Sequence, residues 1–348
     1  MFAQLLRRKK LVYSFIVALV LIVGVQFIYL PYQIRTVNPA ESISERVAVA
    51  GSEHVEKGDF LFTSILSITK PNPVMYLYYK LQKYAEFEPI EKVMANITNL
   101  TAYNQLMEWM RDDSEQNAII AAYRYLQKPI LIEPEGVIVQ SIPKESKSYG
   151  KLQEGDIIIG LEGENIRSAD DLRRIIAGKK DGDVCKMKIT RGREQLELEL
   201  PLMSYPSGDQ TNKVGFYFYF DDVKKSTPTE EIKFNLDDIG GPSAGLMLSL
   251  DIVSKIERKD YTRGYKVAGT GTMDEEGNVG QIGGIKLKIV GASQEGAEYF
   301  FVPKDVNPSN SNEKDAKAMV AEIGSNMKLV PVATLKEATE FLLKLPEK

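Results

Sequence analysis

Histidine and cysteine each occur once among the 348 residues of this sequence, and each scarcity excludes a kind of chemistry. A Ser-His-Asp or Cys-His hydrolase would have to use His54 as its base, yet His54 lies in a polar stretch, 51–56, that is typical of a loop. Cys185 has no partner for an intrachain disulfide, and its place in the alternating run 184–189 predicts a structural role. A His-rich or Cys-rich metal site is also excluded, so we expect no metal ion.

Features that bind nucleotides or nucleic acids are missing as well. No Gly-x-x-x-x-Gly-Lys-Ser/Thr loop occurs, which excludes this kind of ATP site and any ATP-driven step built on it. The net charge of −4 argues against a nucleic-acid partner, because phosphate binding needs a basic surface. We therefore expect no cofactor, no nucleotide and no nucleic acid. A composition of 43% hydrophobic and 26% charged residues is typical of a globular protein of about two domains.

Charge is absent from the run 11–30, which is long enough to cross a hydrocarbon layer of about 30 Å as a helix. Four basic residues, 7–10, precede it, and such a cluster stays in the cytoplasm. The alternative is a cleaved signal peptide, whose apolar region usually has about 7–15 residues and ends at small residues. Residues 30–33 offer no such ending. We expect a cytoplasmic tail (1–10), a retained transmembrane helix (11–30), a tether (31–46) and an extracellular remainder.

Alternation and helical spacing give a coarse outline of residues 47–128. The stretches 47–50 and 58–68 predict the two strands of a hairpin. Apolar residues at i, i+3 and i+4 spacing predict helices over 74–84 and 114–126, with Ser114 as the N-cap of the second.

A strand-rich texture begins near residue 129 and continues to 205. It contains the pattern Leu-x-x-Gly-Asp-x-Ile-x-x-x-x-Gly-x-x-Ile over 152–166. This stretch resembles a PDZ domain, in particular the modules of bacterial extracytoplasmic proteases. The resemblance implies that a peptide adds as a strand beside Gly136, Val137, Ile138 and Val139, with its carboxylate held by the loop before Val137. A sheet domain without a ligand is the alternative.

The stretch Gly240-Gly241-Pro242-Ser243-Ala244-Gly245 follows a predicted strand, 231–237. Glycine permits a sharp turn, and Pro242 suits the first position of a helix, which the apolar residues of 246–256 predict to be buried. Ser243 would lie in the first turn, where free N–H groups favour an oxyanion. The alternative is a serine that only caps the helix.

Two lysines, Lys286 and Lys288, follow the glycine pair 283–284 on another predicted helix. Residues two apart lie roughly 200° apart around a helix, so only one of the two can point into a site. Lys288 shares its face with small and apolar residues, which would lower its pKa by desolvation. The alternative is two solvated lysines.

The motifs around Ser243, Thr270 (Gly-Thr-Gly) and Lys288 (Ile-Gly-Gly-Ile-Lys-Leu-Lys) together resemble the proteolytic domain of the Lon family. The resemblance is good over 206–348 and looser over 47–128, so the PDZ domain (129–205) would be an insertion in an α+β fold whose Lon-type part is mixed α/β. It implies a Ser-Lys dyad with Ser243 as nucleophile, Lys288 as general base and Thr270 as an orienting hydroxyl. The oxyanion and substrate loop would comprise Ile239, Gly241 and Ala244. Gly240 stands where many ATP-dependent Lon enzymes carry an acid, so we assign no acidic third member.

With the anchor and the PDZ domain, the whole chain is similar to membrane-tethered, Lon-like PDZ proteases of Gram-positive bacteria. We expect an ATP-independent serine endopeptidase that cleaves secreted peptides or flexible segments of extracytoplasmic proteins, and a homo-oligomer is compatible with this family. One alternative is a membrane-anchored PDZ scaffold that does not cut. The other is a tail-specific protease, whose motifs differ from Gly-Pro-Ser-Ala-Gly.

Overall fold

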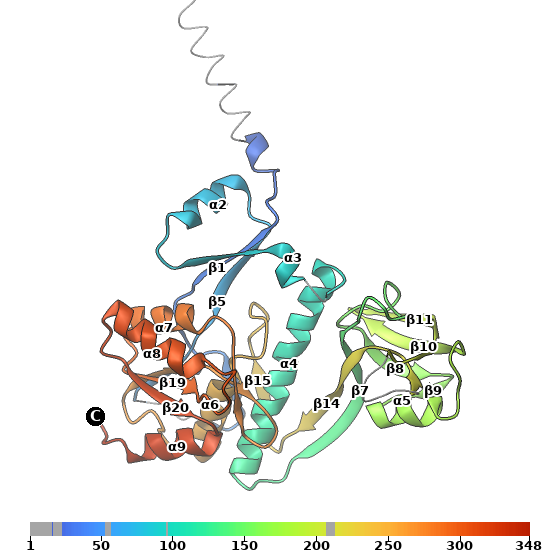
Figure 1. The fold of residues 1–348 in the computed structure, drawn as a ribbon. Helices are drawn as coiled ribbons and strands as arrows, with labels where there is room; N and C mark the ends of the chain where they lie inside the picture. Colours follow the sequence, from blue (N-terminus) through green and yellow to red (C-terminus); the bar gives the residue numbers. More distant parts are fainter. Residues whose placement is uncertain (1–15, 17–22, 53–56, 95–96, 207–212) are drawn as a thin grey trace, which may run out of the picture. The chain divides into compact units, whose positions relative to one another are not determined.

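The computed structural model describes residue 16 and residues 23–52, 57–94, 97–206 and 213–348 (Figure 1). The predicted tail 1–10, most of the predicted transmembrane segment 11–30 and His54 lie outside the described residues. Among the helices that are described, none combines the length and the apolar character needed to span a membrane. The chain forms two compact units, a smaller one from 1–38 and 65–95 and a larger one from 39–64 and 96–348.

The smaller unit is an antiparallel sheet with strand order β5-β1-β6. Its elements are β1 (Tyr32–Val37), β5 (Ile65–Thr69), α2 (Pro73–Lys80), β6 (Ala85–Pro89) and α3 (Ile90–Val93). The prediction of a tether over 31–46 was therefore wrong at its start, because β1 is the central strand and both its edges are paired. Gln33, Ile34 and Thr36 of this strand are buried, and Tyr32, Arg35 and Val37 are partly exposed.

The predicted hairpin between 47–50 and 58–68 does not form. β3 (Val47–Val49) pairs with the distant β15 (Ile232–Phe234), and β4 (Asp59–Phe62) lies parallel to β16 (Lys266–Gly269). Local alternation identifies strands but not their partners. Phe60, Leu61 and Phe62 are all buried, as expected for a parallel strand that is covered on both faces.

A five-stranded mixed sheet, in the order β2-β4-β16-β19-β20, forms the base of the larger unit. Its other strands are β2 (Glu41–Ser42), β19 (Tyr299–Pro303) and β20 (Lys328–Val332), and all pairings except β2 with β4 are parallel. The helices are α4 (Leu100–Tyr125), α6 (Gly245–Glu257), α7 (Ile285–Gln294), α8 (Asn312–Ile323) and α9 (Leu335–Lys344). A short ribbon, β17 (Thr272–Met273) with β18 (Val279–Gly280), follows β16.

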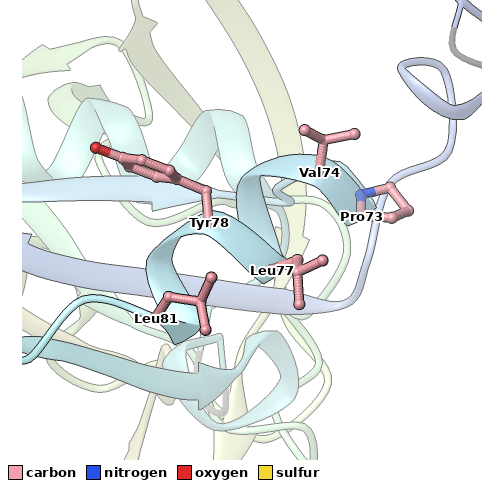
Figure 2. Close-up of a pocket in the computed structure, with 5 residues that line it drawn as sticks. All are labelled: Pro73, Val74, Leu77, Tyr78 and Leu81. Atoms are coloured by element: carbon pink, nitrogen blue, oxygen red, sulfur yellow. The ribbon is translucent and has the colours of Figure 1, made fainter.

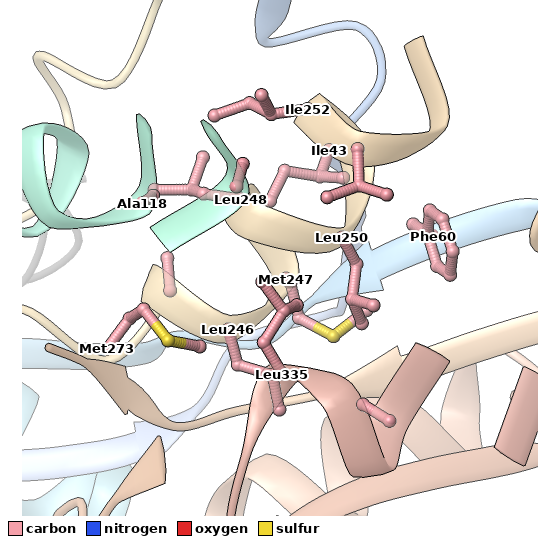
Figure 3. Close-up of a cluster of buried hydrophobic side chains, with 14 of the residues drawn as sticks. Ile43, Phe60, Ala118, Leu246, Met247, Leu248, Leu250, Ile252, Met273 and Leu335 are labelled. Atoms are coloured by element: carbon pink, nitrogen blue, oxygen red, sulfur yellow. The ribbon is translucent and has the colours of Figure 1, made fainter. Parts of the chain in front are cut away.

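The helix α6 is the centre of the main hydrophobic core, as its apolar sequence predicts. Every residue from Gly245 to Lys255 is buried. Figure 3 shows its side chains, including Leu246 and Leu250, gathered with Phe60, Ala118 and Leu335 from other elements. Burying one such leucine contributes about 1.5–3 kcal/mol, so this packing fixes where α6 begins and where the preceding loop lies.

The helix α4 is longer than the predicted helix 114–126. It begins after Asn99, whose side chain accepts a hydrogen bond from the Ala102 N–H, and Ser114 lies in its interior. The polar run 111–116 looked like a helix start because Ser and Asp favour N-caps. Tertiary contacts explain the difference, since the Ser114 hydroxyl donates instead to the carbonyl of Pro242, at 3.1 Å.

A second core lies in the predicted PDZ part of the larger unit, around the sheet β11-β10-β8-β7-β14 with β9 beside β8. The elements are β7 (Leu131–Ser141), β8 (Ile157–Leu161), β9 (Glu164–Asn165), α5 (Ala169–Ile176), β10 (Val184–Arg191), β11 (Glu194–Pro201), β12 (Met203–Ser204), β13 (Val214–Gly215) and β14 (Tyr219–Thr227). Cys185 is fully buried in this core. The core extends to Phe216 and Phe218, beyond the predicted domain end at 205.

Candidate active site

Ser243 lies in the turn that leads into α6. The helix begins at Gly245 with Ala244 as its N-cap, so the prediction that Pro242 is the first helical residue was wrong by three positions. Gly241 adopts a φ of 83°, which glycine reaches without strain, and this bend delays the helix. Two turns of α4 hold the loop from outside: the Gly241 N–H donates to the Met107 carbonyl at 2.9 Å, and Ser114 contacts Pro242.

The structure brings Ser243, Thr270 and Lys288 together. The Lys288 Nζ lies 2.7 Å from the Ser243 Oγ and 3.1 Å from the Thr270 Oγ1. The third neighbour of the amine is the backbone carbonyl of Thr63, at 2.7 Å, which follows β4. Lys288 is 2% exposed, whereas Lys286 is exposed to solvent, so one turn of α7 presents one lysine to the site and the other to water.

Hydrogen-bonding rules determine which group can give a proton to Lys288. The Thr270 hydroxyl donates to the backbone carbonyl of Ser243, at 3.0 Å, so it can only accept from the amine, and the Thr63 carbonyl can only accept. An uncharged amine has two hydrogens and one lone pair. Both hydrogens are then used, and the lone pair faces the Ser243 hydroxyl. The neutral lysine is therefore placed to receive the serine proton.

Burial lowers the pKa of Lys288 to about 7, because a charged ammonium loses its hydration there. The neutral amine is the competent base, so kcat/KM is expected to rise with pH through about 7 as the ammonium loses its proton. The pH profile of peptide cleavage measures this midpoint.

A second group near the loop could produce the same midpoint. Burial, with the nearby charge of Asp112, raises the pKa of Glu115 to about 7. The matched control is Glu115→Gln, which should leave the profile in place. A midpoint that disappears in Glu115→Gln, or a rate that falls as pH rises through this range, would contradict the assignment to Lys288.

Thr270 is fully buried and connects the lysine to the backbone of the nucleophile loop. Replacing it with valine keeps the shape but removes both hydrogen bonds. Hydrogen bonds to groups that carry charge contribute about 1.5–3 kcal/mol, so kcat/KM should fall by roughly 10–100-fold. Thr270→Ser keeps the hydroxyl and should retain most of the activity. A Thr270→Val variant as active as the wild type, or a Thr270→Ser variant as impaired as Thr270→Val, would contradict the role assigned to the hydroxyl.

Only some N–H groups of the predicted oxyanion loop remain able to donate to an oxyanion. The Gly241 N–H is engaged by Met107, and the Ile239 N–H donates to the carbonyl of Leu236 at 2.9 Å. In the described part of the chain, the N–H groups of Ser243 and Ala244 donate to no backbone carbonyl. These two amides, next to the Ser243 Oγ at the start of a buried helix, are the donors that an oxyanion could use.

The strand that was predicted to pair with a peptide in the PDZ domain is not an edge strand of its sheet. Gly136, Val137, Ile138 and Val139 are on β7, which pairs with β8 on one side and with β14 on the other. The edge beside these residues is thus occupied by β14. The sequence did not predict this pairing. Among the described strands β14 pairs with β7 alone, so its outer side is a free edge.

Two segments of the chain match known families. The model of the Lon protease (S16) C-terminal proteolytic domain matches residues 238–345, which include all three side chains of the site. The chain contains a Lon-type proteolytic domain. A PDZ domain model matches residues 108–202, a match that begins within α4 and ends before β14.

Similar proteins include Lon proteases from several bacteria. The Lon protease of Mesomycoplasma hyopneumoniae is 32% identical over 104 residues, which is 30% of this chain and 11% of that protein. That of Rickettsia bellii is 35% identical over 103 residues, 30% of this chain and 12% of that protein. The chain thus aligns with about a tenth of the length of these relatives. A PDZ domain structure from Listeria monocytogenes covers 25% of this chain and 87% of that one, with 23% identity and a TM-score of 0.23.

Proposed function

We propose that this protein is an ATP-independent serine endopeptidase with a Ser243-Lys288 dyad. The observation that carries the proposal is the 2.7 Å contact between a fully buried lysine amine and the Ser243 hydroxyl. Lys288 takes the serine proton as the Oγ attacks a peptide carbonyl, and the N–H groups of Ser243 and Ala244 hold the oxyanion. The ammonium returns the proton to the leaving amine. Water, deprotonated by the same lysine, then hydrolyses the acyl-enzyme.

The substrates that fit this proposal are peptides and flexible segments of other proteins. The sequence contains no phosphate-binding Gly-x-x-x-x-Gly-Lys-Ser/Thr loop, so unfolding driven by ATP at such a loop has no support in this chain. The apolar run 11–30 and the basic residues before it favour a single-pass anchor in the cell membrane, with the larger unit outside. Secreted peptides and extracytoplasmic proteins would then be the accessible substrates.

The free edge of β14 is the place where the PDZ part is most suited to take a substrate strand. Near this edge, the Asp222 carboxylate accepts a hydrogen bond from the Ala169 N–H of α5 at 2.7 Å, and Arg173 lies over the ring of Phe220. A peptide that adds here gains main-chain hydrogen bonds without displacing a strand. Blocking the C-terminal carboxylate of a bound peptide should weaken binding, measured by fluorescence anisotropy. Unchanged affinity would point to recognition of an internal segment.

Cleavage of unfolded casein by the purified full chain, with and without ATP, tests the proposal. We expect cleavage that is independent of ATP and absent in Ser243→Ala. A chain that binds peptides but cleaves none would support the alternative of a membrane-anchored scaffold. Cleavage that persists in Ser243→Ala would exclude this serine as the nucleophile.

A further inference from the structure

One face of α2 carries large apolar side chains that its own sheet does not cover. Val74, Leu77, Tyr78 and Leu81 recur at i, i+3, i+4 and i+7 and are 55%, 61%, 57% and 81% exposed. Figure 2 shows these four residues, the apolar stripe, with Pro73 at the start of the helix. Tyr76 instead packs against the rings of Tyr32 and Phe87, so the unit's own core uses a different face of α2.

The apolar stripe begins where the chain leaves the apolar run 11–30. The Leu30 N–H donates to the Pro71 carbonyl at 2.9 Å, and Asn72, the next residue, is the N-cap of α2. The residues just before Leu30 are also apolar and exposed: Phe27 is 74% exposed, Ile28 is 52% exposed and Tyr29 is 65% exposed. The hydrogen bond between Leu30 and Pro71 therefore lies between two exposed apolar segments of one unit, residues 27–29 and the apolar stripe.

Contiguous exposed apolar side chains mark interaction sites. The residue types of the apolar stripe and its neighbours indicate the kind of partner. Tyrosine is enriched at the boundary between lipid and water, where the ring is buried and the hydroxyl is wet. Lys80 and Lys83 flank the stripe, and their Nζ atoms lie over the rings of Tyr76 and Tyr84. Lysine beside an apolar helix face suits anionic lipid headgroups.

We propose that the apolar stripe and residues 27–29, which end the run 11–30, lie in the interfacial layer of the membrane that this run enters. This inference rests on the proposed anchor. Headgroups add about 5–7 Å to each side of the hydrocarbon layer, so a segment hydrogen-bonded to Leu30, at the end of the run, starts within that layer. With the anchor in the membrane, the apolar stripe is next to lipid headgroups, and a protein partner would have to displace them to reach it.

The test uses single cysteines in the full chain, reconstituted into vesicles of phosphatidylcholine and phosphatidylglycerol. Cys185 is the sole cysteine and is buried, so an introduced cysteine reacts alone. Leu77→Cys and Leu81→Cys are labelled with an environment-sensitive fluorophore. We expect a blue shift of emission on reconstitution and quenching by lipids brominated in the acyl chain. The matched control is Leu66→Cys on β5 of the same unit, a leucine that is 42% exposed and should show neither effect.

Flotation of the same vesicles separates the two proposals. If the chains float with lipid but the labels at 77 and 81 behave like the label at 66, the apolar stripe does not lie in the membrane, and the proposed anchor still holds. Chains that do not float would overturn both. Disulfide formation between copies of Leu77→Cys, with emission insensitive to brominated lipid, would show that a second copy covers the stripe and would also overturn the proposal.

Leu77→Glu with Leu81→Glu gives an independent measurement. Both side chains are exposed, so the pair should not unfold the smaller unit, which circular dichroism checks. The variant should still float, because the run 11–30 is unchanged, but a label at Val74→Cys should lose its quenching. Quenching that survives two new charges on the same helix face would contradict insertion of the stripe.

Discussion

Replacing Lys288 with methionine is expected to lower kcat/KM for an unfolded protein by roughly 10²–10⁴-fold, the usual contribution of a positioned general base. The Lys288 Nζ is the only described basic group within hydrogen-bond distance of the Ser243 hydroxyl, at 2.7 Å. Methionine has a similar length and no charge, so the buried pocket around this 2% exposed side chain is kept filled. Lys288→Met should therefore lower kcat while the protein keeps its fold.

Three variants make this result specific. Lys288→Arg should be as inactive as the methionine variant, because a guanidinium stays protonated and cannot accept the serine proton. Lys286→Met, two residues away on the same helix but exposed, should keep the wild-type rate. Ser243→Ala combined with Lys288→Met should lose no more than either alone, since the two groups act as one unit. Near-normal cleavage by Lys288→Met would exclude the dyad.

The three side chains of the site could be predicted because each stands in a short motif with strict backbone requirements. Helix geometry showed only that one of Lys286 and Lys288 can point into the site, and the resemblance to the Lon family selected Lys288. The structure buries Lys288 and exposes Lys286. The Thr63 carbonyl, which also holds the lysine, could not be foreseen. A backbone carbonyl cannot be recognised from the residue type, and the position of this one depends on the pairing of β4 with β16, whose paired residues are 207 positions apart in the chain.

The partners of the strands were the least predictable part of the fold. Nothing local in the sequence shows that β14 completes the PDZ sheet by pairing with β7. The polar run 111–116 and Pro242 were both interpreted through capping preferences. Packing overrode those preferences in each case, since α4 continues through Ser114 and α6 begins three residues after Pro242.

Lys255→Met is expected to destabilise the larger unit by about 3–5 kcal/mol, because it breaks a buried ion pair and leaves a charge without its partner. The Lys255 Nζ lies 2.9 Å from the Asp251 carboxylate one turn earlier in α6, and it also donates to the carbonyls of Ser44 and Val47. Asp251 has no exposed surface, and its other oxygen accepts from the Ser44 hydroxyl at 2.6 Å. This pair fixes α6 to Ser44 and to the first residue of β3.

Urea unfolding followed by the fluorescence of Trp109, the single tryptophan, reports on the larger unit because α4 packs against α6. The matched control is Lys336→Met. Its partner Glu340 is also four residues away, at 3.9 Å, but both side chains are exposed, so the loss should be about 0.5 kcal/mol or less. A loss in Lys255→Met no larger than that of the control would contradict the buried-pair interpretation.

The pH dependence of Lys255→Met gives the sharper result. Burial raises the pKa of Asp251, and Lys255 is the main group that opposes this rise. Without Lys255 the folded-state pKa should climb further above the unfolded value, so the folded state binds more protons between the two pKa values. Stability then falls as pH rises through that window and is recovered as pH falls through the folded pKa. Asp251→Leu with Lys255→Met removes both charges and should recover most of the stability, without this pH dependence.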